Sequence, residues 1–112
     1  MPNQNVSLDR VFHALADTTR RKVVERLGAG AELSATELAR RFDMALPSFT
    51  QHLSVLEDCG LVRSKKTGRV RSYRLVPEKL RTAEHWLERQ RTEWNQRLDQ
   101  LDSLLNILKE QQ

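Results

Sequence analysis

The segment from Ala45 to Leu56 contains no Asp, Glu, Lys or Arg, although the outer faces of surface helices usually carry charges. Its polar side chains are neutral hydrogen-bonding groups. Such groups suit the edges of DNA bases, because Gln can bridge adenine, Ser and Thr can serve several bases, and a Thr methyl can touch thymine. We expect Phe49 and Leu53 to face the core. The alternative to base reading is that the polar side chains form an ordinary solvated face of the helix. The candidate base-reading residues are Leu46, Pro47, Ser48, Thr50, Gln51 and His52.

A run of basic residues without any acidic residue follows this segment. Residues 61–75 carry six basic side chains and no acidic one, and the glycine-bearing turn around Gly68 predicts a β-hairpin. Hairpins of this kind lie on the phosphate backbone. Taken alone, the pattern would also fit a solvated basic hairpin. The candidate backbone contacts are Lys65, Lys66, Arg69 and Arg71.

Two short helices must position these groups. Ser34 and Glu37 form a capping box, which predicts a helix that runs through Leu38, Ala39 and Phe42. A turn at about residues 43–45 leads to the neutral helix, which Gly60 ends. We therefore predict a helix-turn-helix over residues 34–59 and a wing over residues 61–75, a device that places the second helix in the major groove.

The N-terminal part predicts a flexible arm over residues 1–6 and two helices. The first would span about Ser7 to Ala16 with Ser7 as its N-cap, and Asp17 would cap the second. A basic run, residues 20–22, lies in the first turns of the second helix, where the helix dipole disfavours cations. An anionic neighbour, either Asp17 or a phosphate, would explain these cations.

The C-terminal part carries an apolar stripe at steps of three, four and seven residues, which predicts one helix over residues 78–110. Such a helix would be ~50 Å long and would extend past its own domain. A second copy of the same helix would cover the stripe. The alternative is that the segment folds back near Asn95. The candidate dimerisation residues are Leu8, Phe12, Leu87, Trp94, Leu98, Leu101 and Leu105.

Length and composition limit the class of protein. The 112 residues fit one domain, residues 1–112. Cys59 is the single cysteine, so no internal disulfide can form, and we expect an inert buried thiol in a cytoplasmic protein. Neither a secretion signal nor a membrane span is expected. The expected fold class is mostly α with a small β-hairpin, a winged helix-turn-helix with a long C-terminal dimerisation helix.

Several motifs together resemble a known family. Residues 15–21 (LADTTRR), 36–39 (TELA), 51–56 (QHLSVL) and 60–62 (GLV) are similar to the ArsR/SmtB type of bacterial transcriptional regulators, in order and in spacing. The resemblance implies a homodimeric repressor that binds a palindromic operator in double-stranded DNA. The last helix resembles that of a subgroup without metal sites. Family members often carry Ser at the position of Ala45, and Ala cannot cap the next helix.

Other functions are weaker alternatives. A metal-responsive repressor of the same fold would need more ligands than His85 and Glu88, which share one helix face, unless a partner chain supplied two. A winged-helix protein-interaction module is the other alternative. No phosphate-binding glycine loop or catalytic arrangement is present in the sequence, so we expect no enzymatic activity, cofactor or metal.

Overall fold

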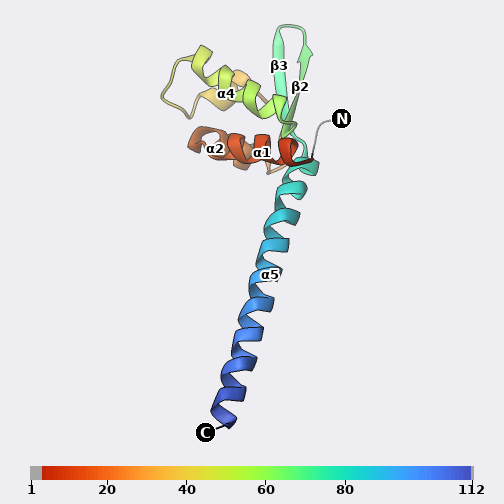
Figure 1. Ribbon diagram of the computed structural model, residues 1–112. Coiled ribbons are helices and arrows are strands. Elements are labelled where there is room, and N and C mark those ends of the chain that lie inside the picture. The colour runs from red at the N-terminus through yellow and green to blue at the C-terminus, as the bar shows by residue number, and fades with distance from the viewer. Residues whose placement is uncertain (1–3, 112) are drawn as a thin grey trace.

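The computed structural model describes residues 4–111, in which five helices and three short strands follow one another (Figure 1). The helices are α1 (Gln4–Leu15), α2 (Thr18–Leu27), α3 (Ala35–Ala39), α4 (Leu46–Asp58) and α5 (Pro77–Glu110). The strands are β1 (Leu33–Ser34), β2 (Val62–Thr67) and β3 (Val70–Leu75). The expected fold class, mostly helical with a hairpin wing and a long last helix, is confirmed.

Helix α1 begins at Gln4, three residues before the predicted start. Ser7 therefore lies inside the helix, and the prediction that it is the N-cap is wrong. Its hydroxyl oxygen accepts a hydrogen bond from Lys79 Nζ of α5 at 2.9 Å. The side chain of Ser7, which the local sequence predicts to cap α1, instead bonds α1 to α5. Of the predicted flexible arm, residues 4–6 are helical, and residues 1–3 lie outside the described part of the chain.

Side-chain caps set the starts of α2 and α3 as predicted. Asp17 Oδ2 accepts from the Arg20 amide at 3.0 Å. In the capping box, the Glu37 amide donates to Ser34 Oγ at 3.1 Å and the Ser34 amide donates to Glu37 Oε1 at 3.3 Å. Helix α3 ends at Ala39, earlier than predicted, because Phe42 turns out of the helix and its ring packs on Phe49 with 5.1 Å between centroids.

The sheet is antiparallel with strand order β1-β3-β2. Thr67 pairs with Val70, so Gly68 and Arg69 form a two-residue turn. Gly68 has φ +64°, which fits the first central position of the hairpin turn that glycine favours. Strand β1, whose Leu33 pairs with Tyr73, was not predicted, because two residues are too few to show a period of two.

The core gathers apolar side chains from every layer of the domain. Phe49 and Leu53 of α4 are fully buried, as predicted. The other large side chains with at most 1% exposure are Val11, Val23, Leu27, Leu38, Leu56, Leu61 and Val62. Because α4 contributes three of the nine, the helix that carries the candidate readers is held rigidly from its inner side.

Helix α5 leaves this core and continues as a single rod (Figure 1). The alternative of a hairpin near Asn95 is therefore wrong. The molecule measures 76 × 35 × 23 Å, and its radius of gyration is 20.4 Å against about 13 Å for a compact domain of this length. Only one residue, Val76, separates β3 from α5, and its amide donates to the Leu61 carbonyl at 2.8 Å.

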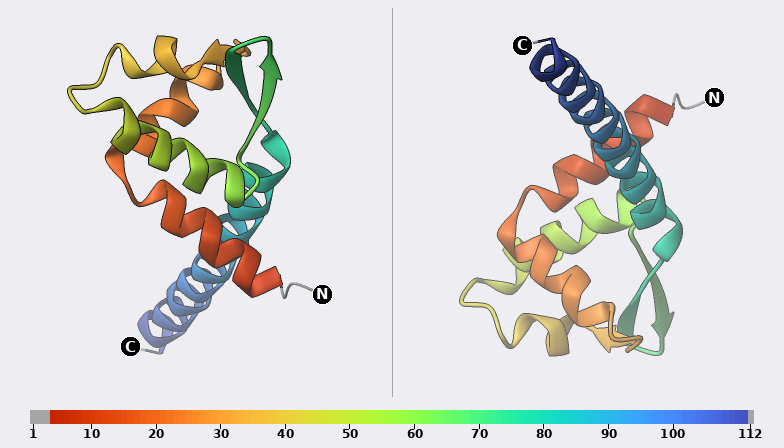
Figure 2. Two further views of the ribbon diagram at one scale, coloured as in Figure 1. Left: turned by 90° about the horizontal axis from the view of Figure 1, so that it is seen from above. Right: turned by 90° about the horizontal axis from the view of Figure 1, so that it is seen from below.

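The first turns of α5 are the part that packs on the domain. Figure 2 shows α1 crossing this part of α5, where Phe12 meets Trp86 edge to face at 5.5 Å between ring centroids. Ala83 is buried on the same helix. In the part of the chain that the structure describes, no helix is both long enough and apolar enough to cross a membrane.

Candidate DNA-binding surface

The outer face of α4 presents most of the predicted base-reading residues to solvent. Its buried residues recur at positions 49, 53 and 56, so the opposite side is free of core contacts. Pro47 lies in the first turn, where its missing N–H costs nothing. Ala45 is the N-cap and has no side-chain acceptor, as expected. The exposed predicted readers are Leu46, Pro47, Ser48 and Gln51, whereas Thr50 and His52 are half-buried.

Two of the three hydroxyl groups on this helix donate their hydrogen to a backbone carbonyl of the helix itself. Thr50 Oγ1 donates to the Pro47 carbonyl at 3.0 Å, and Ser54 Oγ donates to the Thr50 carbonyl at 3.1 Å. A hydroxyl has one donor and two acceptor sites. Thr50 is therefore arranged to accept rather than donate on its outer side.

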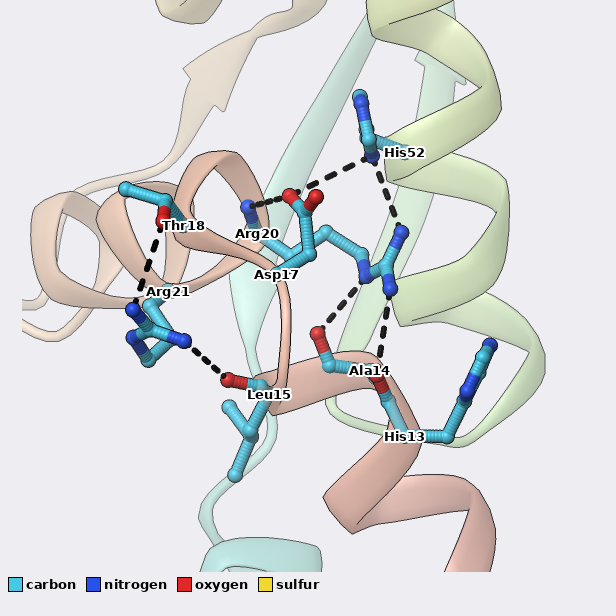
Figure 3. Close-up of polar contacts among 8 residues, drawn as sticks. All are labelled: His13, Ala14, Leu15, Asp17, Thr18, Arg20, Arg21 and His52. Atoms are coloured by element: carbon cyan, nitrogen blue, oxygen red, sulfur yellow. Dashed lines mark hydrogen bonds and ion pairs between the residues drawn. The ribbon is translucent and has the colours of Figure 1, made fainter.

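His52 turns toward the junction of α1 and α2 (Figure 3). Its Nδ1 lies 3.1 Å from Arg20 Nη1 and 3.7 Å from Asp17 Oδ2. Its side chain is 24% exposed. Of the six predicted readers, His52 is thus the one whose side chain hydrogen-bonds to another helix.

Two of the three cations at the start of α2, Arg20 and Arg21, bond to the end of α1. Arg20 Nε donates to the Ala14 carbonyl at 2.7 Å, and Arg20 Nη2 donates to the His13 carbonyl at 3.2 Å (Figure 3). Arg21 Nη1 donates to the Leu15 carbonyl at 2.9 Å. The last carbonyls of a helix lack intrahelical partners and carry partial negative charge. The C-terminus of α1, together with Asp17, therefore supplies negative charge beside Arg20 and Arg21.

The carboxylate of Asp17 is stabilised in its ionised form. The hydrogen bond from the Arg20 amide has the largest effect and lowers the pKa of Asp17 below its ordinary value. Burial opposes this effect, whereas the positive charge of Arg20, and that of His52 when it is protonated, lowers the pKa further. The junction of α1 and α2 therefore holds an anion between the basic side chains.

The basic residues of the wing lie on both faces of the hairpin. Side chains alternate along a strand, so Lys66 and Arg71, which pair across the two strands, share the face of buried Tyr73. Lys65 lies on the opposite face, and Arg69 is in the turn. All four predicted backbone contacts are exposed. The wing can thus offer positive charge on either side of its tip.

A chain of hydrogen bonds connects the wing to the end of α4. Glu57 Oε2 accepts from the Ser64 amide at 2.8 Å and also from the Ser64 hydroxyl. Arg71 Nη1 donates to Ser64 Oγ at 2.8 Å. Neither Glu57 nor Ser64 was predicted from the sequence, in which the only sign is an acidic residue directly after the uncharged residues 45–56. This chain fixes the wing relative to α4.

The candidate dimerisation residues divide into two groups. Those on α5 are exposed by about half, namely Leu87, Trp94, Leu98, Leu101 and Leu105. Leu8 and Phe12 of α1 are partly buried against the chain's own core. Trp86, which meets Phe12, and Leu104, Ile107 and Leu108 extend the apolar surface of α5.

Metal and thiol chemistry have little support in the site. Among residues 4–111, no three His, Cys, Asp or Glu side chains form a group that could hold a metal ion. His85 and Glu88 line a shallow pocket on α5 beside Arg89, a cation. Cys59 is buried, and desolvation raises the pKa of its thiol. A protonated buried thiol reacts slowly.

Comparisons with known proteins agree with this geometry. A family model described as a helix-turn-helix domain matches residues 15–65. The HTH-type transcriptional regulator Rv2034 of Mycobacterium tuberculosis is 46% identical over 71 residues, which are 63% of this chain and 65% of that protein. The transcriptional repressor SdpR of Bacillus subtilis is 29% identical over 80 residues, 71% of this chain and 88% of SdpR.

A solved structure extends the likeness to nearly a whole protein. The crystal structure of the ArsR family transcriptional regulator RHA00566 is similar with a TM-score of 0.78 and 44% identity, and the match covers 85% of this chain and 97% of that one. The likeness thus includes much more than the helix-turn-helix. With its uncharged stretch of α4 up to Leu56, its basic wing and this degree of identity, the chain belongs to the ArsR family of helix-turn-helix transcriptional regulators.

Proposed function

We propose that the protein is a homodimeric repressor that binds a palindromic operator in the cytoplasm and catalyses no reaction. The observation that carries the proposal is the uncharged, exposed half of α4 beside a wing with six basic residues and no acidic one. Neutral side chains can read base edges, whereas cations bind every phosphate alike. Specificity and affinity are therefore assigned to different elements.

The roles of the individual residues follow from their exposure. Ser48 and Gln51 read base edges, Leu46 and Pro47 make apolar contacts at the start of α4, and Thr50 accepts hydrogen bonds. Lys65, Lys66, Arg69 and Arg71 hold the phosphate backbone. His52 also takes part, with its orientation set by α2. SdpR, a relative named as a repressor, supports the direction of regulation.

The apolar stripe of α5 supports the homodimer. Eight large apolar residues of α5, from Leu87 to Leu108, are each about half exposed in the single chain. Contiguous exposed apolar surface of this kind marks a protein interface. A second copy of α5 supplies a matching stripe, and a two-fold dimer presents two copies of α4 to two half-sites.

The salt dependence of DNA binding tests this function. If each protomer neutralises about four phosphates, the affinity of the dimer should fall with log salt at a slope of about 7. Footprinting on DNA selected from the source genome should show two half-sites one helical turn, about 34 Å, apart. An affinity for duplex DNA that does not change with salt contradicts DNA binding, and a single protected half-site at saturation contradicts the dimer.

A further inference from the structure

Three donor groups of the Arg20 guanidinium each point at an acceptor. Two of them reach the Ala14 and His13 carbonyls at 2.7 and 3.2 Å, which fixes the guanidinium at the end of α1. The third, Nη1, lies 3.1 Å from His52 Nδ1 on the recognition helix α4 (Figure 3). Arg20 therefore connects α1 and α2 to a candidate base-reading side chain.

This contact determines which ring nitrogen of His52 carries the hydrogen. Arginine has five donors and no acceptor, so Nδ1 can bond to Nη1 only as the acceptor. A neutral ring then carries its hydrogen on Nε2. The other group facing Nδ1 is Asp17, and its Oδ2 at 3.7 Å is beyond hydrogen-bond distance. Of these two neighbours, Arg20 is the one that bonds to Nδ1.

The second ring nitrogen points away from both neighbours. In Figure 3 it lies on the side of the ring opposite Arg20 and Asp17. His52 follows exposed Ser48 by one helical turn and stands next to exposed Gln51. A hydrogen on Nε2 is thus carried by the same helix face that presents the exposed readers.

We propose that Arg20 is a positioning residue that holds His52 as the Nε2–H tautomer, so that His52 can only donate a hydrogen bond to the operator. This proposal rests on the proposed function and adds the direction of the hydrogen bond. The matching groups on DNA are acceptors: purine N7, guanine O6, thymine O4 or a phosphate oxygen. An amino group of cytosine or adenine at this position is rejected, because two donors would face each other.

Nuclear magnetic resonance of the free protein tests the tautomer without DNA. A two-bond ¹H–¹⁵N spectrum at mildly alkaline pH should show His52 with its hydrogen on Nε2. Arg20→Met should allow both tautomers. Arg21→Met is the matched control, because Arg21 also bonds to an α1 carbonyl but none of its hydrogen bonds reaches His52. A wild-type ring with its hydrogen on Nδ1 overturns the proposal, and so does an Arg20→Met spectrum identical to that of wild type.

Selection from a randomised duplex library tests the consequence for DNA. His52→Asn keeps an acceptor near the Nδ1 position for Arg20 but cannot reach as far as Nε2, so it should fold normally and stand in if Arg20→Met proves unstable. Both variants should lose roughly tenfold preference at one base pair of each half-site, with the others unchanged. Arg21→Met should keep the wild-type preference at that base pair.

Further results show whether the acceptor is a base or a phosphate. They also distinguish failure of this proposal from failure of the proposed function. If His52→Asn weakens all sequences alike, the acceptor is a phosphate and the donor role stands; the salt slope should stay constant, because a neutral ring neutralises no phosphate charge. If the variant changes neither preference nor affinity, the donor role is wrong. A wild-type protein that selects no sequence contradicts the proposed function, while the tautomer spectrum still decides the role of Arg20.

Discussion

At the scale of single residues, Gln51 and Arg69 represent the two kinds of DNA contact that we propose. Gln51 is exposed in the uncharged part of α4, and Arg69 is exposed in the turn of the wing. Gln51→Ala should cost about 1 to 3 kcal/mol on the preferred site and relax sequence preference. Arg69→Ala should weaken all sequences alike, because a phosphate contact carries no sequence information. Titrations of each variant with preferred and scrambled duplexes compare them.

The same titrations show whether base reading is assigned to the right element. If Arg69→Ala changed sequence preference while Gln51→Ala weakened every duplex equally, the wing would read bases and α4 would lie on the backbone. The salt slope gives an independent measure, since it should fall by about one per protomer for Arg69→Ala and remain constant for Gln51→Ala.

Asp17 links stability to pH through its capping hydrogen bond. Because the folded-state pKa is lowered, the ionised carboxylate stabilises the fold above the ordinary Asp pKa of about 3.9, and this stabilisation is lost as the pH falls through the folded value. Asp17→Ala should lower the free energy of unfolding by about 1 kcal/mol at neutral pH. The difference should shrink near about pH 3. Urea unfolding at both pH values measures it.

A control isolates the capping effect from the loss of one negative charge. Asp9 is an exposed carboxylate in α1, so Asp9→Ala removes the same charge without removing the cap of α2. Its effect should be small at both pH values. An Asp17→Ala variant that is as stable as wild type at neutral pH would mean that the hydrogen bond to the Arg20 amide contributes no net stability.

At the scale of elements, Glu57 determines how firmly the wing is held. It accepts two hydrogen bonds from Ser64, which in turn accepts one from Arg71. Hydrogen bonds to a charged group contribute about 1.5 to 3 kcal/mol when well formed. Glu57→Ala should therefore speed amide hydrogen exchange in β2 and β3 and leave the core of α4 protected. Exchange followed by mass spectrometry resolves the two regions.

The neighbouring residue provides a matched control for this change. Asp58 is also acidic and also ends α4, but it is exposed and does not hold the wing through Ser64. Asp58→Ala should leave exchange in the wing unchanged. Equal exchange in the two variants would show that the hydrogen bonds of Glu57 do not fix the hairpin.

Whether the start of a helix or a strand could be predicted depends on whether the residues that form it are close in the sequence. Asp17 and Ser34 set helix starts through neighbours three residues away, and both caps were predicted. Ser7 was predicted wrongly because it bonds to Lys79, which is 72 residues away, and β1 forms only because it pairs with β3. The neutral face of α4 and the charge of the wing were readable from residue types. The Arg20–His52 and Glu57–Ser64 contacts were not, because they need the packed fold.

At the scale of the whole molecule, the exposed stripe of α5 is the surface that we propose for the dimer. Leu98→Asp with Leu101→Asp should separate the proposed dimer, because two charges per chain would be buried in an apolar interface. Light scattering should then give half the wild-type mass. Gln96→Asp with Gln100→Asp adds the same charge on the opposite side of α5 and should keep the dimer. An unchanged mass for the leucine pair would assign the interface to another surface.

The single residue between β3 and α5 has a mechanical consequence. Val76 is tied to Leu61 through its amide, so the wing strand passes into the long helix without a flexible linker. In the proposed dimer, α5 acts as a lever whose pivot is this junction, and the angle there sets the separation of the two reading heads. The protein would then distinguish operators with altered half-site spacing through the rigidity of the junction at Val76, and not through any contact with a base.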